Sequence, residues 1–168
     1  MNKLCLSLIA AFCISAAANA DVPVYRNKAL SIDQALVVTD AGTRYYKDVK
    51  LSANPDGSFR LVQAELLEPV HVDEVMVLVE EYPVVVSVEV SGYLPNPCFQ
   101  LEEPAVMREG STFTIVLAQR ALQTFTACAQ VIEPFTVLVP LNVKGLAAGH
   151  YTVMVNDQQS GFDLDVDN

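Results

Sequence analysis

The sequence has few basic residues: 10 Lys and Arg stand against 20 Asp and Glu, which gives a formal net charge of −10 over 168 residues. Nucleic acids and anionic membrane surfaces attract proteins through positive patches, so this balance argues against both kinds of partner. A strongly acidic surface also favours solubility, which is the simpler reason for the charge. We therefore expect no nucleic-acid partner.

Histidine is scarce as well, with His71 and His150 as its two members. The sequence has no G-x-S-x-G motif, no phosphate-binding glycine loop, no dinucleotide fingerprint and no zinc-ligand spacing. A serine, threonine or cysteine nucleophile needs a base within reach, and we expect His150 to be an exposed turn residue. His71 shares a strand face with Asp73, but two ligands are too few for a metal site. We predict no enzyme, no catalytic residue and no cofactor.

Hydrophobic runs long enough for a targeting segment are confined to the first twenty residues. An apolar stretch at 4–17 follows Lys3, and Ala18-Asn19-Ala20 supplies the small residues that signal peptidase requires. This stretch is short for a membrane-spanning helix, although a retained anchor is the alternative. Phe12 before Cys13 is too bulky for a lipidation site. We predict a signal peptide at 1–20, cleavage after Ala20, and a periplasmic or secreted product that does not insert into a membrane.

Cysteine is also sparse. Cys5 and Cys13 lie in the predicted signal peptide, which leaves Cys98 and Cys128 in the mature chain. Two cysteines in an exported protein are most simply explained by one disulfide. The alternative, a metal-binding pair, lacks a nearby histidine or cysteine at ligand spacing. Closing a loop of about thirty residues should stabilise the fold by about 3–4 kcal/mol.

Alternation with a period of two residues is the dominant pattern, together with heavy use of valine. The even-numbered valines from 84 to 90 lie on one face of a half-buried strand, and residues 112–118, 151–156 and 162–166 repeat the pattern. These runs are too short and too rich in β-branched residues for helices. The pattern predicts an all-β protein.

Turn residues separate the runs. We predict a hairpin at Asn54-Pro55-Asp56-Gly57 and turns at 109–111 and 158–161. Residues 31–34 resemble a helix capping box, but the surrounding alternation favours a strand. Residues 119–129 could hold one helical turn.

The chain divides near Glu68-Pro69. Residues 21–68 predict a small three-stranded β-meander, and residues 70–168 predict about seven strands, the number expected of an Ig-like antiparallel β-sandwich. Three strands alone form a marginal core, which favours packing of the meander against the sandwich.

A motif of the form L-x-x-G-x-Y precedes one alternating strand, with Leu146, Gly149 and Tyr151 at its defined positions. It resembles the tyrosine corner of Ig-like sandwiches, in which the tyrosine hydroxyl bonds to an upstream backbone group. Glycine at 149 suits a backbone with positive φ.

The wider run of residues 92–98, Cys128, Pro134-Phe135 and 141–151 resembles bacterial secreted Ig-like β-sandwich proteins of unassigned function, over residues 86–166. The resemblance implies the fold and the disulfide, and it implies no active site. The chain departs from antibody domains because it has no tryptophan and because its first mature cysteine follows two prolines. The bridge is therefore expected to tie loops rather than the two sheets.

Three alternate carboxylates, Asp163, Asp165 and Asp167, lie near Asn156 and Asp157. They are weak calcium candidates, because calcium prefers several oxygen ligands. The simpler explanation is a charged edge strand, which resists pairing with other chains.

The segment Tyr93, Leu94, Pro95, Asn96 and Pro97 is a possible recognition loop, because two prolines and the disulfide restrict it. In the alternative interpretation it is a rigid connection with Leu94 in the core.

These features favour an exported, non-catalytic binding or accessory protein, whose partner is a protein or another extracytoplasmic ligand. Alternatives are a secreted protease inhibitor that uses the 93–98 loop, a hydrolase built from carboxylates, and a structural assembly subunit.

Overall fold

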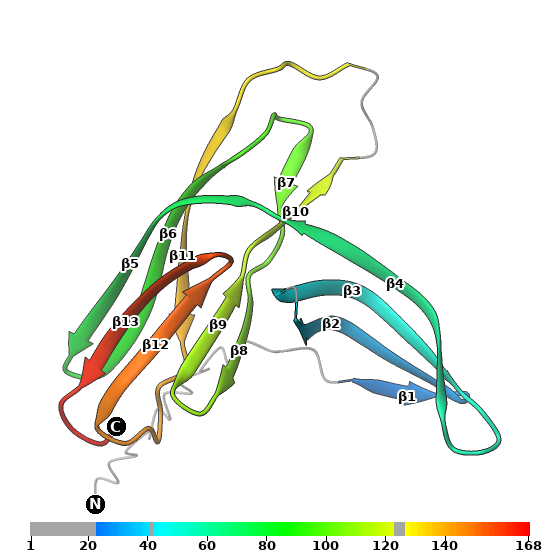
Figure 1. The fold of residues 1–168 in the computed structure, drawn as a ribbon, viewed down its shortest axis with the longest axis horizontal. Coiled ribbons are helices and arrows are strands. Elements are labelled where there is room, and N and C mark those ends of the chain that lie inside the picture. The colour runs from blue at the N-terminus through cyan, green and yellow to red at the C-terminus, as the bar shows by residue number, and fades with distance from the viewer. Residues whose placement is uncertain (1–22, 41, 123–126) are drawn as a thin grey trace, which may run out of the picture.

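A computed structural model describes residues 23–40, 42–122 and 127–168. The predicted signal peptide and part of the possible helical turn at 119–129 lie outside these residues. Every regular element that the structure describes is a β-strand (Figure 1). Accordingly, none of the described residues forms a helix long and apolar enough to cross a membrane.

Thirteen strands are described along the chain (Figure 1). They are β1 (Val24–Arg26), β2 (Ala29–Thr39), β3 (Gly42–Ala53), β4 (Phe59–Pro69), β5 (His71–Glu81), β6 (Val84–Leu94), β7 (Phe99–Leu101), β8 (Ala105–Glu109), β9 (Thr112–Val116), β10 (Ala118–Ala121), β11 (Glu133–Leu141), β12 (Gly149–Val155) and β13 (Gln158–Leu164). The all-β prediction is confirmed, and residues 31–34 are part of a strand as expected.

Seven of these strands form the predicted sandwich. One sheet has the order β11-β6-β5, and the facing sheet has the order β13-β12-β9-β8. The pairing of β9 with β12 is parallel, with Thr112 opposite Thr152, whereas the prediction was an antiparallel sandwich throughout. This pairing joins two segments that lie far apart in the sequence.

The core of the sandwich follows the predicted alternation. Val86, Val88 and Val90 of β6 are fully buried, while Glu89 between them is exposed. They meet apolar side chains of the facing sheet, namely Phe113, Ile115, Tyr151, Val153, Val155, Phe162 and Leu164. Val166 was expected to continue this row, but β13 ends at Leu164 and Val166 is 63% exposed.

Two of the three predicted turns are present in the structure. The connections at 54–58 and 110–111 lie where the turn residues place them. The turn expected at 158–161 is wrong, because these residues belong to β13. The β12–β13 turn consists of Asn156 and Asp157, and Asn156 has a φ of 50°. Asparagine is among the few residues other than glycine that adopt this conformation readily.

Strands β1 to β4 form an arm, residues 24–69, that projects from the sandwich (Figure 1). The predicted meander is present as β2, β3 and β4, with the short β1 added at its edge. Its sheet continues beyond β4 through β10 and β7. The chain therefore passes between this sheet and the sandwich at several connections, among them β4–β5 and β9–β10.

The base of the arm packs against the sandwich through a second apolar cluster. It contains Tyr45, Leu67, Ala105, Val116 and Ala118, with Leu36 packed against it. The Tyr45 hydroxyl donates to the carbonyl of Glu103 at 3.3 Å. Burial, followed by the charges of Glu102 and Glu103, raises the pKa of Tyr45 to about 12, so the phenol stays protonated at neutral pH. The meander is thus docked at one end.

Candidate functional site

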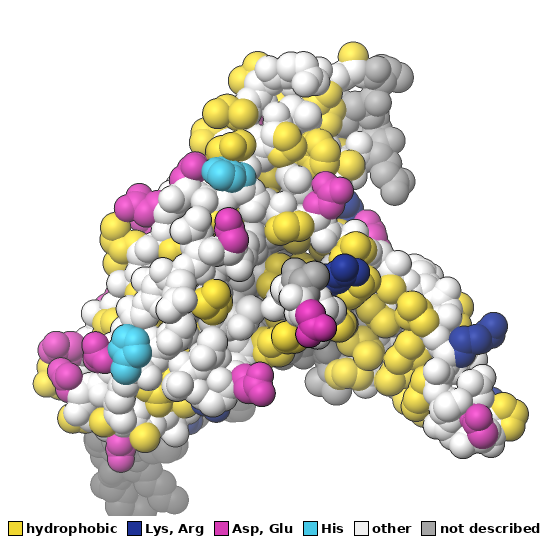
Figure 2. Space-filling model, in the orientation of Figure 1, with side chains coloured by type: hydrophobic (Ala, Val, Ile, Leu, Met, Phe, Trp, Pro, Cys, Tyr) yellow, Lys and Arg dark blue, Asp and Glu magenta, His cyan; other side chains and the backbone are white. Residues whose placement is uncertain are grey.

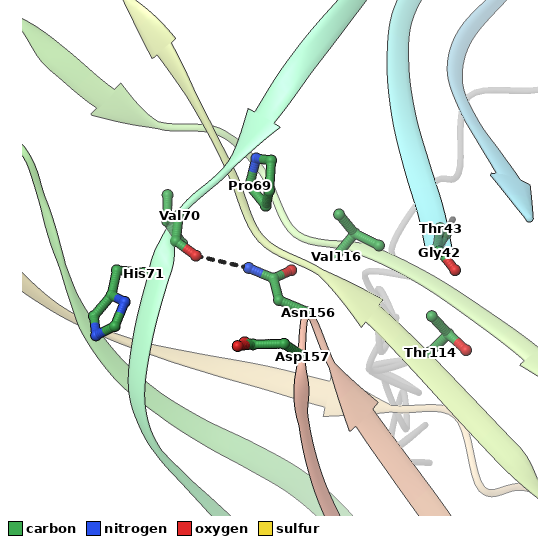
Figure 3. A pocket seen from close by; sticks show the side chains of 9 residues that line it. All are labelled: Gly42, Thr43, Pro69, Val70, His71, Thr114, Val116, Asn156 and Asp157. Carbon is green, nitrogen blue, oxygen red and sulfur yellow. Dashed lines mark hydrogen bonds between the residues drawn. The ribbon is translucent and has the colours of Figure 1, made fainter. Parts of the chain in front are cut away.

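Two buried residues, Val70 and Leu117, lie at two adjacent points where the chain crosses between the arm sheet and the sandwich. The amide of Val70 donates to the carbonyl of Leu117 at 3.1 Å. Asn156 binds both: its Nδ2 donates to the carbonyls of Val70 and Leu117 at 3.0 Å each, and its Oδ1 accepts from the Leu117 amide at 3.0 Å. The bond to Val70 is drawn in Figure 3. One side chain therefore ties both crossing points to the β12–β13 turn.

A cleft of about 510 Å³ opens beside these crossing points (Figure 3). Its walls come from the arm, from the start of β5, from β9 and from the β12–β13 turn, and its lining residues are Gly42, Thr43, Pro69, Val70, His71, Thr114, Val116, Asn156 and Asp157. The polar groups of Asn156 are already engaged in the contacts above. Asp157 supplies the charged carboxylate of this lining.

The geometry of the cleft is poor for acid–base chemistry. The ring of His71 points away from Asn156 and Asp157 (Figure 3). Its Nε2 lies 3.2 Å from Oδ1 of Asp73, and its ring contacts that of Tyr93 in a tilted arrangement with centroids 4.5 Å apart. General acid–base catalysis needs a titratable group within hydrogen-bond reach of the reacting atom, and this histidine is directed elsewhere.

An ion cluster lies where the arm meets β10. Nζ of Lys47 lies 2.6 Å from Oε2 of the buried Glu102, and Nε of Arg120 lies 3.2 Å from Oε1 of Glu102 and 3.6 Å from Oε1 of Glu65. Burial raises the pKa of the Glu102 carboxyl, but hydrogen bonds from Lys47 and Gln100 and the two cationic charges lower it below its ordinary value. The cluster connects β3, β4 and β10, so its role is to hold the arm.

The outer half of the arm exposes an apolar sheet face. Tyr25, Leu30, Leu51 and Leu61 are directly opposite one another across β1, β2, β3 and β4, so they share a face. Phe59 is two residues from Leu61 on the same strand, and its ring meets that of Tyr25 with centroids 6.5 Å apart. Leu61 is 59% exposed. We call these five residues the distal apolar face, and Figure 2 shows hydrophobic side chains gathered over the arm.

The opposite face of the arm tip carries arginines together with the exposed Val24. The neighbouring cross-strand row consists of Arg26, Ala29, Ser52 and Arg60. The ion pairs within the described residues involve neither of these arginines, nor Lys28 at the β1–β2 turn. The arm tip thus has an apolar face and, on its other face, arginines that form no ion pair among the described residues.

The disulfide joins Cys98 to Cys128, with Cα atoms 6.0 Å apart. Cys98 lies between β6 and β7, and Cys128 lies in the segment before β11, so the bridge ties two connections. The tyrosine motif makes the contact typical of its kind: the Tyr151 hydroxyl donates to the carbonyl of Ala147 at 2.9 Å. Gly149 has a φ of 150°, and Leu146 is buried.

The possible recognition loop does not present the side chain expected of it. Leu94 is 5% exposed and belongs to the sandwich core, as the alternative interpretation required. Tyr93 is half-buried against His71, while Pro95 and Pro97 are exposed and Asn96 accepts a bond from the Cys98 amide at 2.9 Å. A protease cleft could therefore not receive Leu94 from this fold.

The calcium candidates are not grouped as a set of metal ligands, although Asp163 and Asp165 line the same groove. Asp163 pairs with His150 at 2.9 Å, and Oδ1 of Asp167 accepts from the amide of Ala148 at 2.7 Å. His150 itself lies in β12 rather than in a turn. Asp157 is at the other end of the same hairpin, because the β12–β13 register places Asp163 opposite His150. Among the residues with described positions, no three His, Cys, Asp or Glu side chains are grouped as metal ligands.

Sequence reasoning missed the role of Asn156 and the distal apolar face. The signal for Asn156 was the Asn-Asp pair between two alternating strands, which is typical of a two-residue hairpin turn. The signal for the face was the apolar content of residues 59–67. The sequence predicts no further layer that would cover Phe59, Leu61 and Val62.

The fold defines an all-β protein in which a two-sheet sandwich carries a projecting sheet. Residues 88–164, from β6 to the end of β13, match the family model described as the ORF11 beta-sandwich domain. The match supports the sandwich and does not include the arm. Searches of curated proteins and of solved structures gave no match.

Proposed function

We propose that the protein is exported and acts as a non-catalytic binding protein that holds a partner protein on its distal apolar face. The observation that carries this proposal is the face itself, because a sheet normally buries its apolar side against another layer. The arm is tied to the sandwich by Asn156 and by the Glu102 cluster, so the face is held at a defined position. Rigid presentation lowers the entropic cost of binding.

The chemistry of the arm specifies the partner. Its contact surface should have an apolar centre that covers Leu61 and Phe59, and acidic groups at its margin that meet Arg26 and Arg60. Such an arrangement is typical of interfaces, in which apolar anchors supply affinity and peripheral charges supply orientation. The Cys98–Cys128 disulfide supports a partner in an oxidising compartment outside the cytoplasm.

Site-specific photocrosslinking tests the proposal. A crosslinking amino acid is placed at position 61, on the apolar face, and as a matched control at position 44, which is an exposed residue of the same arm away from that face. We expect a protein adduct at position 61 that is absent at position 44 and that excess unlabelled protein competes away. Equal labelling at the two positions, or none at either, would contradict the proposal.

Export is tested separately by sequencing the N-terminus of the mature product. We expect it to begin at Asp21, one residue after the small-x-small motif. Recovery of the chain with its first twenty residues intact would contradict cleavage.

A further inference from the structure

A second exposed apolar surface lies at the other end of the molecule, where β5 and β13 end (Figure 1). It is a groove of about 390 Å³ whose apolar walls include Val79, Tyr82, Val84 and Val166. Tyr82 is 95% exposed, so its ring is available to a ligand. Large exposed aromatic side chains are favoured as anchors in protein interfaces.

Acidic side chains rim this groove. Glu81 and Asp165 line it without an ion-pair partner among the residues whose positions are described, and Asp163 lines it beside His150. In Figure 2, Asp and Glu side chains gather at this end of the sandwich, whereas Lys and Arg side chains occur near the arm tip together with an acidic one. Residues 70–168 contain three basic and thirteen acidic side chains, whereas residues 24–69 contain six of each.

The groove and the arm tip are complementary in apolar character and in charge. The tip offers the aromatic rings of Tyr25 and Phe59 on one face of its sheet and, at the neighbouring positions on the other face, Arg26 and Arg60, which have no ion-pair partner among the described residues. The groove offers an exposed tyrosine and aliphatic walls beside unpaired carboxylates. The two surfaces are at different ends of one molecule. The arm tip of a chain therefore cannot reach the groove of the same chain without a large rearrangement.

We propose that the arm tip of one copy occupies the acid-rimmed groove of the next, so that the protein self-associates head to tail. This inference rests on the proposed function and names the partner as a second copy of this chain. Because the two contact surfaces differ, the interface is heterologous, and repetition of the contact gives a ring or an open filament. Opposite charges at the margin make association weaker at high ionic strength.

Two variants with exposed substitutions test this contact. The tip variant carries Arg26→Gln and Phe59→Ser, and the groove variant carries Glu81→Gln and Tyr82→Ser. Sedimentation velocity over a concentration series should show self-association of the unmodified mature protein, weaker when salt is raised from 0.05 to 0.5 M (about a 3-fold shorter Debye length). We expect each variant alone to associate at least about tenfold more weakly, because each loses an aromatic anchor and a charge.

Mixing the two variants gives the decisive result. The groove variant keeps its tip and the tip variant keeps its groove, so the mixture should form a complex that stops at one copy of each. The matched control variants, Arg44→Gln and Glu133→Gln, remove the same charges away from both surfaces and should assemble like the unmodified protein. Unfolding midpoints of all variants establish that each is folded.

The outcomes separate the two proposals. A monomeric unmodified protein, or a mixture that forms no complex, overturns head-to-tail association. If the crosslinker at position 61 then captures a different protein, the binding function stands and its partner is not a second copy. If position 61 captures nothing, both proposals fail.

Discussion

The Asn156→Gly variant should lose about 3 kcal/mol of free energy of unfolding. The substitution removes three side-chain hydrogen bonds of 3.0 Å to the backbone of Val70 and Leu117. Each such bond contributes about 0.5–1.5 kcal/mol, with the upper end expected where a buried backbone group loses its partner. Glycine adopts the φ of 50° without steric penalty, so the measured loss reports the hydrogen bonds rather than backbone strain.

Urea unfolding followed by tyrosine fluorescence measures this loss, since the chain has no tryptophan. Asp157→Ala is the matched control, because Asp157 is the other residue of the same turn and is exposed. We expect the control to change stability by less than about 0.5 kcal/mol.

The same bonds fix the direction of the arm, which gives a second measurement. Spin labels at positions 60 and 89 report the distance between arm tip and sandwich. We expect one narrow distance distribution in the unmodified protein and a broad one in Asn156→Gly. A variant that keeps both its stability and its narrow distribution would refute the assignment of Asn156 as the residue that holds the two crossing points.

Three further perturbations have expected outcomes. Gly92→Ala should cost about 3 kcal/mol or more in urea unfolding, because a Cβ there would lie 2.1 Å from the carbonyl oxygen of His71, and an unchanged midpoint would disprove this steric argument. Glu102→Gln should cost about 1.5–3 kcal/mol at neutral pH. Its folded-state pKa is lowered, so the wild-type advantage is present above the unfolded pKa of about 4.3 and fades as pH falls through the folded value; an advantage that persists at pH 2 would contradict this. Removal of the disulfide by Cys98→Ala with Cys128→Ala should cost about 3–4 kcal/mol, and equal stability of the oxidised protein and the double variant would contradict that estimate.

The strands of the sandwich could be predicted because each carries its own pattern. Alternation in 84–90 places the valines inward whatever the neighbouring strand is, and the structure buries them accordingly. The prediction that Val166 is buried was wrong, because alternation in the sequence does not show where strand pairing ends. The pairing of β13 with β12 ends where Leu164 lies opposite Gly149.

Gly161 shows why the last turn was misplaced. A glycine next to serine and glutamine resembled a turn residue, but it lies in β13, where a Cβ would come 2.9 Å from the carbonyl oxygen of Tyr151. Glycine is needed here because it has no side chain, which lets the two strands approach closely. It is not needed to provide a positive φ. A sequence does not distinguish these two uses of glycine.

The arm and its attachment could not be derived from local patterns. The pairing of β4 with β10 joins Pro69 to Ala118, and Asn156 reaches Val70 across 86 residues. Such contacts depend on the path of the whole chain. The groove at the end of β5 has the same origin, because Glu81 and Asp165 meet only after the two sandwich sheets have stacked.

The position of Asn156 near the C-terminus has a genetic consequence. A stop codon just ahead of it would leave every residue of the arm encoded, yet the truncated product would lack the amide that fixes the arm's base, along with all of β13. Lesions in the β12–β13 hairpin should therefore appear as defects in the orientation of the arm. During biosynthesis the ribosome releases the arm first, and its final orientation waits for the last strands to be made.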